Sequence, residues 1–353
     1  MVHMPILRHL DRAEWEAEAR TFWDLSYRQC WAYANAAARD VGARAEFVGV
    51  YDGDRLIGLA NVRVKSVPIL RLGMAYVNHG PLTRDGAGFA PDRFRTCLRA
   101  LEQHYVKRRK LLLRIAPPSS GGLALTDQAE AIGALGFRAA EGVKPLESFV
   151  VDLERDLPAL RRSFDKKWTA SLTRAEKLGV TVTRTQDPAD FQQFEELYRG
   201  LVERKGFYAR QGASFFSAVS REARAVDRLE LHLAWHEGDL VAGHVGSFVG
   251  DTAVMILAAA NPQGRDLCAS FALQWAVVQR AKSLGQLYYD LGGIDQVANP
   301  DVYRFKKRMN GRHVVAQSYE LAPSPARKAA MDLLETMWGQ VRALRRGRTA
   351  RPA

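Results

Sequence analysis

Apolar and polar positions alternate in the same way in two distant stretches of the chain. An apolar run lies on each side of an acidic-Gly-Asp turn in FVGVYDGDRLIGLANVRV (residues 47–64) and in LHLAWHEGDLVAGHVGSFV (residues 231–249). Alternation around such a turn is typical of a β-hairpin. Aligning Gly53 with Gly238 also aligns Gly58 with Gly243, at a common offset of 185 residues. We therefore expect two copies of one folding unit.

The same kinds of element follow each hairpin. They are a strand, a helix and a second strand, at 74–82, 92–110 and 111–118 in one half and at 251–260, 268–285 and 286–293 in the other. This order predicts an α/β (α+β) protein in which each half is a mixed, mostly antiparallel sheet flanked by helices. It suits the GNAT acyltransferase fold, here duplicated.

The second unit is expected to begin with the apolar run ESFVVDL (residues 147–153). A long helix is predicted over 156–179, because apolar residues recur there at helical spacing, at Leu160, Phe164, Trp168, Leu172 and Ala175. Another helix is expected over 188–205. We expect a first domain at 1–146, a second at 147–320, and at 321–353 a C-terminal helix with a basic tail that packs back on the first.

The amino-acid composition indicates a basic protein and gives no sign of a cofactor. The 353 residues carry a net charge of +12, which favours an anionic partner, although an arginine-favouring genome would produce the same excess. Three scattered cysteines, Cys30, Cys97 and Cys268, form no CxxC pair and predict neither disulfides nor zinc. No apolar run approaches the length of a membrane span. We expect a cytoplasmic protein without cofactor or metal.

The histidines do not predict a metal site. If residues 230–236 form a strand, His232 and His236 lie about 13 Å apart and cannot share one ion with His244. These side chains are expected to be exposed or satisfied structural histidines. The chain also has no G-x-S-x-G, HExxH or P-loop motif.

The pyrophosphate loop of CoA-dependent GNAT enzymes is also missing. A Q/R-x-x-G-x-G/A loop would offer backbone N–H groups to the pyrophosphate. The corresponding NPQGRDLCAS (261–270) has one glycine, and TRDGAGFAPDR (83–93) in the first half does not match either. This argues against an acyl-CoA donor.

A glycine-rich strand exit leads directly into a cluster of cations. YYDLGGIDQVANPDVYRFKKRMNGR (288–312) carries no acidic residue from Tyr303 onward, but five basic ones, at Arg304, Lys306, Lys307, Arg308 and Arg312. Such a concentration of like charge is costly unless an anion approaches it.

Several segments together resemble the Fem (FemABX) family of aminoacyl-tRNA-dependent peptidyltransferases. They are AYVNHGPL (75–82), FDKKWTASLTRAEKLGV (164–180), ERKGF (203–207), LQWAVVQRAKSLGQLYYDLGGID (273–295) and VYRFKKRMNG (302–311). The resemblance spans nearly the whole chain in the right order, and the family has two tandem GNAT-like domains. It implies transfer of an amino acid from charged tRNA to a primary amine, typically on a peptidoglycan precursor.

The resemblance also implies roles for individual residues. Lys306 would lie at the reacting ester carbonyl, where an ammonium can stabilise the developing negative charge, and Asp290 would accept the proton of the attacking ammonium. Substrate would be bound by Phe305, Tyr303, Tyr289, Gly292, Gly293 and, at the phosphates of the acceptor, Arg204. The tRNA backbone would be held by Lys166, Lys167, Arg174, Lys177, Lys307 and Arg308, for which a solvated charged face is the alternative.

Two features leave the acceptor and the donor open. Family members that bind a UDP-linked muramyl peptide are expected to carry a lysine where this chain has Asn35, so that acceptor is in doubt. An N-acyltransferase using acyl-CoA or an acyl carrier protein is the alternative function, and a non-catalytic adaptor is a third. The terminal arginines, Arg342, Arg345, Arg346, Arg348 and Arg351, suit RNA or peripheral contact with an anionic membrane.

Overall fold

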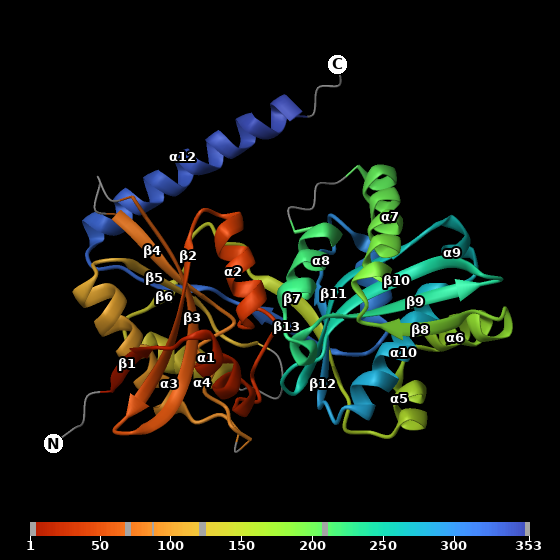
Figure 1. The fold of residues 1–353 in the computed structure, drawn as a ribbon, viewed down its shortest axis with the longest axis horizontal. Helices are drawn as coiled ribbons and strands as arrows, with labels where there is room; N and C mark the ends of the chain where they lie inside the picture. The colour runs from red at the N-terminus through yellow and green to blue at the C-terminus, as the bar shows by residue number, and fades with distance from the viewer. Residues whose placement is uncertain (1–4, 68–71, 87, 120–124, 207–210, 350–353) are drawn as a thin grey trace.

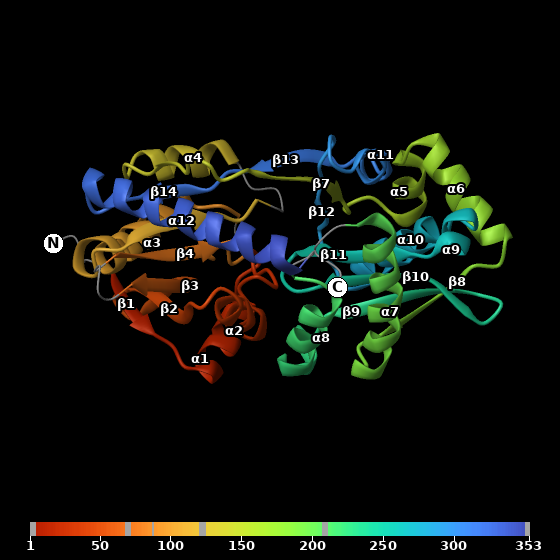
Figure 2. The ribbon, with the colours of Figure 1, turned by 90° about the horizontal axis from the view of Figure 1, so that it is seen from above.

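Two seven-stranded sheets, one for each half of the chain, lie side by side (Figure 1). The structure is a computed structural model that describes residues 5–67, 72–86, 88–119, 125–206 and 211–349. Helices cover both faces of each sheet (Figure 2). None of the helices in this part of the chain is long and apolar enough to cross a lipid bilayer.

The first sheet is mostly antiparallel. Its strand order is β1 (Ile6–His9), β2 (Arg44–Asp52), β3 (Arg55–Val67), β4 (Leu72–Asn78), β5 (Leu112–Ala116), β14 (Tyr319–Leu321) and β6 (Arg138–Ala139). Only β4 and β5 pair in parallel among the described strands of this sheet. Its helices are α1 (Arg12–Glu18), α2 (Trp31–Asp40), α3 (Pro91–Leu101), which continues as a π-helical segment (Glu102–Arg108), and α4 (Leu125–Gly133).

The second sheet repeats this plan. Its strand order is β13 (Arg312–Ala316), β7 (Leu146–Asp152), β12 (Tyr288–Gly293), β11 (Thr252–Ala260), β10 (Asp239–Ser247), β9 (Glu230–His236) and β8 (Thr181–Thr185). The parallel pair is now β11 and β12. Its helices are α5 (Leu157–Ser163), α6 (Lys166–Lys177), α7 (Pro188–Lys205), α8 (Ala213–Glu222), α9 (Pro262–Asp266), α10 (Ala269–Ser283) and α11 (Pro300–Lys307).

The two hairpins predicted from the alternation are β2–β3 and β9–β10, paired in antiparallel register. Their turn glycines, Gly53 and Gly238, both adopt positive φ, as such turns require. The expected tandem GNAT-like fold is therefore confirmed, because hairpin, strand, helix and strand occur in the same order in both halves.

The single helix expected over 156–179 is wrong. The chain is extended at Phe164, and the Asp165 side chain accepts hydrogen bonds from the backbone N–H groups of Lys167 and Trp168. Asp165 thereby acts as an N-cap and starts a new helix, α6. The apolar stripe still faces the core, since Leu160, Trp168 and Ala175 are each no more than 1% exposed.

The C-terminal segment returns to the first sheet. β13 belongs to the second sheet, whereas β14 pairs with β5 and β6 of the first. Strand pairing thus places Tyr319 and Glu320 with the first half, although the expected second domain ran to residue 320. With that change, a division at 146/147 stays our proposal for the domain boundary.

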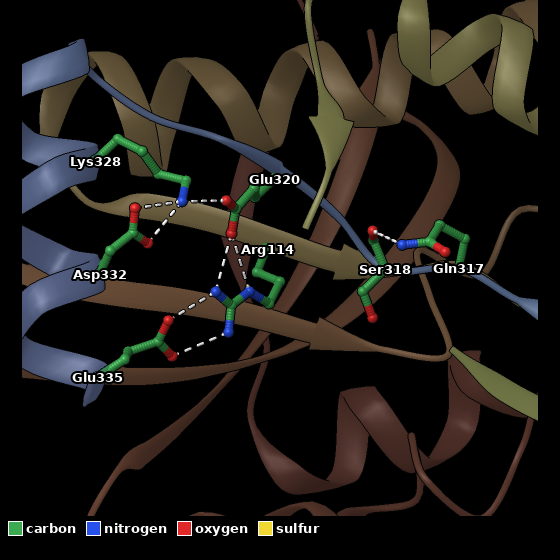
Figure 3. Close-up of polar contacts among 7 residues, drawn as sticks. All are labelled: Arg114, Gln317, Ser318, Glu320, Lys328, Asp332 and Glu335. Carbon is green, nitrogen blue, oxygen red and sulfur yellow. Dashed lines mark hydrogen bonds and ion pairs between the residues drawn. The ribbon is translucent and has the colours of Figure 1, made fainter. Parts of the chain in front are cut away.

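A long helix, α12 (Pro325–Thr349), then runs along the first sheet (Figure 1). Figure 3 shows the ion pairs that fix it. Buried Arg114 of β5 contacts Glu320 and Glu335, both at 2.9 Å. Lys328 bridges Glu320 at 2.8 Å and Asp332 at 2.6 Å. Arg351 lies outside the described residues, so the proposed contact of the basic tail stays a prediction.

Candidate active site

The parallel strands β11 and β12 stop pairing where the site begins. Their register runs from Thr252↔Tyr288 to Val254↔Asp290. Gly292, two residues further on, adopts φ +70°. A Cβ there would lie 2.6 Å from the Met255 carbonyl oxygen and 3.8 Å from Lys306 Nζ. Only glycine fits without strain, and the strand exit presents its backbone to the lysine.

Lys306 is buried at this exit, with 4% of its surface exposed. It lies near the end of α11, because Pro300 starts a helix that continues to Lys307. Its Nζ donates to the carbonyl oxygens of Gly293 at 2.8 Å and Gly292 at 3.3 Å. An ammonium has three N–H donors, and the described residues offer the third no partner.

Burial sets the charge state of this ammonium. It lowers the pKa of Lys306 to about 8, while the Asp290 carboxylate opposes the shift. The amine is therefore still mostly charged near neutral pH. A cation that has lost its hydration and keeps one free donor is suited to stabilising an oxyanion.

Asp290 is the second expected catalytic residue, on β12. It is 5% exposed, and its Oδ1 accepts the backbone N–H of Gly292 at 2.9 Å. Its negative charge raises the pKa of Lys306 against the effect of burial, and it also acts on Tyr27 and Arg28 of the first half. The structure therefore brings the two expected catalytic residues into one electrostatic group.

The first half contributes residues that the sequence analysis missed. Arg28 stacks on the Tyr27 ring at 4.6 Å. Tyr27 packs edge-on against Tyr33 at 5.0 Å, and the Tyr33 hydroxyl donates to Gln211 of the second half. The interleaved aromatic and basic residues of SYRQCWAY (26–33) were a weak signal in the sequence, and only the docking of the halves brings Tyr33 to Gln211.

Tyr289 points to the opposite face of β12 and is fully buried. Its hydroxyl donates to Gln274 of α10 and lies 3.3 Å from His244 Nε2. The expectation that Tyr289 contacts substrate is therefore wrong for this conformation, because strand alternation turns it into the core. Burial raises the pKa of Tyr289 well above its usual range.

The three histidines of the second sheet do not converge on one site. His232 and His244 are cross-strand neighbours with ring centroids 5.8 Å apart. His236 lies at the other end of β9, where it pairs with Asp239 beside the β9–β10 turn. His232 is buried without a hydrogen-bond partner in the described residues, so the expectation of a satisfied or exposed histidine fails there. Burial lowers its pKa to about 4, which keeps it neutral.

One group of potential metal ligands occurs in the described residues, away from this site. Atoms of His9, Glu46 and His104 lie within 4.8 Å of one another. The Glu46 carboxylate already contacts Arg44 and Arg109, each at 2.6 Å. Its charge is therefore neutralised, and a cation would have to displace both arginines.

Three other residues that were expected to bind substrate make contacts within the protein. Phe305 is half-buried and packs against Phe271, with ring centroids 4.9 Å apart. Tyr303 lies 5.8 Å from Lys307 Nζ, in cation–π geometry. Arg204, at the end of α7, donates to the Ala260 carbonyl oxygen at 3.0 Å.

Three of the cations expected to bind tRNA line one shallow groove of about 590 Å³ on α6. Its lining is Lys166, Thr169, Ala170, Thr173, Arg174, Lys177 and Leu178. Lys167 is exposed but is not part of that lining, and Arg308 Nε lies 3.9 Å from Asp165. The groove combines positive charge with small and polar side chains, as a phosphate backbone would require.

The segment at the position expected for a pyrophosphate loop, residues 261–270, uses its own backbone groups for contacts within the protein. The Asn261 side chain accepts the Gly264 N–H at 2.7 Å and caps α9. A Cβ at Gly264 would lie 2.1 Å from the Val241 carbonyl oxygen, so this glycine serves close packing. The backbone amide is not free for a phosphate, in agreement with the missing motif.

Known proteins resemble this chain over most of its length. A family model described as an acetyltransferase (GNAT) domain matches residues 162–307. The chain is 21% identical to a lipid II:glycine glycyltransferase of Staphylococcus saprophyticus, over 72% of this chain and 76% of that protein. A crystal structure of FemX has a TM-score of 0.75 at 18% identity, covering 90% of this chain and 97% of that one.

The structure of L-PGS from Bacillus licheniformis is a more distant match, with a TM-score of 0.54 at 14% identity, covering 93% of this chain and 96% of that one. At these low identities the solved structures establish only the fold. The glycyltransferase and the acetyltransferase family model support the type of reaction, which is acyl transfer. The chain is thus similar to proteins of the Fem family, and it is an acyltransferase of the GNAT type.

Proposed function

We propose that this protein transfers an aminoacyl group from aminoacyl-tRNA to a primary amine of a cell-envelope precursor, as in peptidoglycan, and forms an amide bond. The observation that carries the proposal is the buried Lys306 ammonium, held by two carbonyl groups and with one N–H that no described residue accepts. Aminolysis of an ester develops negative charge on the carbonyl oxygen, and a preorganised donor lowers that barrier.

The reaction needs little besides this cation. The acceptor ammonium gives a proton to Asp290, and its nitrogen attacks the ester carbonyl carbon while Lys306 stabilises the oxyanion. The carbon–oxygen bond to the tRNA ribose then breaks, and the leaving oxygen takes a proton from the attacking nitrogen. An ester already has an adequate leaving group, so no cofactor or strong base is required.

The donor and the acceptor rest on separate observations. The cations of the α6 groove, Lys166, Arg174 and Lys177, favour a tRNA donor, as does the net charge of +12. The similarity to a lipid II:glycine glycyltransferase favours a lipid-linked peptidoglycan acceptor. Asn35 donates to the Trp31 carbonyl oxygen within its own helix, so it does not replace a phosphate-binding lysine.

An acyl-CoA or acyl-carrier donor is the second candidate, favoured by the matched acetyltransferase domain. The capped Gly264 N–H argues against free CoA but leaves a carrier protein. A basic surface could bind an acidic carrier protein as readily as RNA.

The test compares two labelled donors with one pool of acceptors. Purified protein is incubated with radiolabelled charged tRNA or acetyl-CoA and with an extract rich in envelope precursors. We expect label to leave tRNA, and Lys306→Ala to slow this about 100-fold or more. Arg304→Ala is the control, because Arg304 lies on the same helix, is exposed, and pairs only with Asp301. Label leaving acetyl-CoA instead would support the second candidate.

A further inference from the structure

A cavity of about 530 Å³ opens in the second half of the molecule, and the proposed reaction does not use it. Residues of β8, β9 and α10 and the segment after β10 form its wall, which includes Arg184, Arg228, Glu230, Phe248, Val249 and Arg280. We call it the arginine cavity. Its volume lies within the range of sites for small molecules, about 300–1,000 Å³.

The arginine cavity lies at the opposite edge of the sheet from Lys306. Phe248 directly follows Ser247, the last residue of β10, which pairs with Val254 near the start of β11. Since β11 and β12 pair in parallel from their first residues, the cavity lies beside the start of β12. Lys306 contacts the glycine exit at the other end of that strand. A strand of this length spans roughly 17–20 Å, so the two sites are separate.

Positive charge exceeds negative charge in the wall of the arginine cavity. Its three arginines face one carboxylate, Glu230, which is 4% exposed. Glu230 accepts hydrogen bonds from Arg280 at 2.7 Å and from Arg184 at 3.5 Å. One carboxylate cannot neutralise three guanidinium groups, so the cavity favours an anion.

Arg228 is the cation that has no acid to pair with. Its Nε is buried, and no described residue accepts a hydrogen bond from it. Asp227, its neighbour in the chain, pairs with Arg20 of the first half at 2.8 Å. The Arg228 carbonyl oxygen accepts from the Gln186 side chain at 3.4 Å, which holds the backbone in place. Because a buried N–H without an acceptor is unfavourable, Arg228 is suited to a ligand that brings one.

The rest of the wall is partly apolar. The Phe248 ring is half-buried and packs against His232, with ring centroids 5.7 Å apart. Val226 is exposed, and Val249 packs against the apolar core of the first half. A bare inorganic anion would leave this surface in water, whereas a ligand with an apolar group would cover it.

We propose that the arginine cavity binds a small phosphate monoester that carries a ring, with Arg228 and Arg184 at the phosphate and Phe248 against the ring. A phosphate monoester carries close to two negative charges near neutral pH, which matches the excess of cations. Its oxygens also fit the parallel N–H donors of a guanidinium. Nucleoside and aryl monophosphates belong to this class.

The experiment measures binding by calorimetry, with no donor or acceptor of the transfer reaction present. The probes are phenyl phosphate, inorganic phosphate and phenol, which separate the contributions of the ring and of the charge. We expect phenyl phosphate to bind at least about 10-fold more tightly than either of the other two. Arg228→Gln should weaken phenyl phosphate about 10-fold or more, and Arg228→Lys should keep part of the affinity. Phe248→Ala should remove the advantage of phenyl phosphate over inorganic phosphate.

Matched variants separate the arginine cavity from general effects of charge. Arg221→Gln is the control, because Arg221 on α8 is also exposed but does not line the cavity. It should bind phenyl phosphate as the wild type does. If Arg228→Gln does not fold, as judged by circular dichroism, Arg184→Gln still tests the site, because the Arg184 side chain is 47% exposed.

Three results would overturn the inference. They are no binding of phenyl phosphate, equal binding of phenyl phosphate and inorganic phosphate, and unchanged affinity in both Arg228→Gln and Arg184→Gln. Lys306→Ala should bind phenyl phosphate normally, and a loss of binding there would assign the ligand to the active site instead. Failure of aminoacyl transfer with intact binding of phenyl phosphate would count against the proposed function alone.

Discussion

Arg84 of the first half and Asp251 of the second form an ion pair across the junction, with side chains only 9% and 7% exposed. The backbone N–H of Asp251 also donates to the Trp23 carbonyl oxygen at 2.9 Å. A Cβ on the neighbouring Gly250 would lie 2.3 Å from the Leu25 carbonyl oxygen. The two halves are thus in close backbone contact here, and this contact helps to fix how the two sheets dock.

Breaking this pair should destabilise the protein. Asp251→Asn leaves Arg84 buried and unpaired, and we expect a loss of about 3–5 kcal/mol in the free energy of unfolding. Urea denaturation measures it. The control is Asp301→Asn in the exposed pair with Arg304, which should cost about 0.5 kcal/mol or less. Equal losses would show that burial does not set the strength of the Arg84–Asp251 pair.

The lowered pKa of Lys306 predicts a stability that increases with pH. The folded-state pKa is about 8 and the unfolded value is 10.5, so between these values the unfolded chain binds more protons and stability increases with pH. From pH 7 to about 9.5, the wild type should gain about 2 kcal/mol relative to Lys306→Met. Urea titrations at both pH values give this difference. A constant difference would mean that the pKa of Lys306 is not lowered.

The same pKa predicts a loss of activity in base. If Lys306 acts as an ammonium, single-turnover rates should fall as pH rises through about 8. Lys306→Arg should be slower but should keep its rate to higher pH, because a guanidinium does not lose its proton there. Rates are corrected for the uncatalysed hydrolysis of the ester. An unchanged falling limb in Lys306→Arg would assign that limb to another group.

Gly292→Ala should reduce both stability and transfer. The substitution strains a residue at φ +70° and drives a methyl group toward the Met255 carbonyl oxygen. We expect a loss of about 2–3 kcal/mol in unfolding free energy. Gly142→Ala is the matched control, with φ +72° and nothing within 4 Å of its Cβ, and should cost only about 1 kcal/mol. Similar costs would show that the approach to Met255 is not tight.

The α6 groove predicts the salt dependence of tRNA binding. Replacing Lys166, Arg174 and Lys177 together with Ala should weaken binding and reduce the slope of log K against log salt by about 2–3. Filter binding at several salt concentrations measures the slope. The control is Arg161→Ala, because Arg161 is engaged with Glu176 at 2.6 Å. A slope equal to that of the wild type would exclude these cations from the RNA interface.

Local patterns sufficed for the secondary structure and for part of the site. The two hairpins, the α10 helix and the glycine exit of β12 follow from alternation, helical period and turn chemistry, all of which act within a few residues. The roles of Lys306 and Asp290 were implied by the resemblance to a known family and stay predictions. The break at Phe164 was missed, because the apolar stripe continues across it and only the cap formed by Asp165 ends the first helix.

The duplicated unit, the kinds of element and the cationic strand exit can be read from the amino-acid sequence, because hydrogen bonding in turns and the burial of one face are local constraints. Strand pairing in the folded protein sets which of Tyr288 and Tyr289 faces the core, since a shift of one residue in register exchanges them. The fold likewise brings the Tyr33 hydroxyl of the first half to Gln211 of the second. That pairing depends on how two separately built sheets dock, and the docking is set by contacts such as Arg84 with Asp251, between residues far apart in the chain.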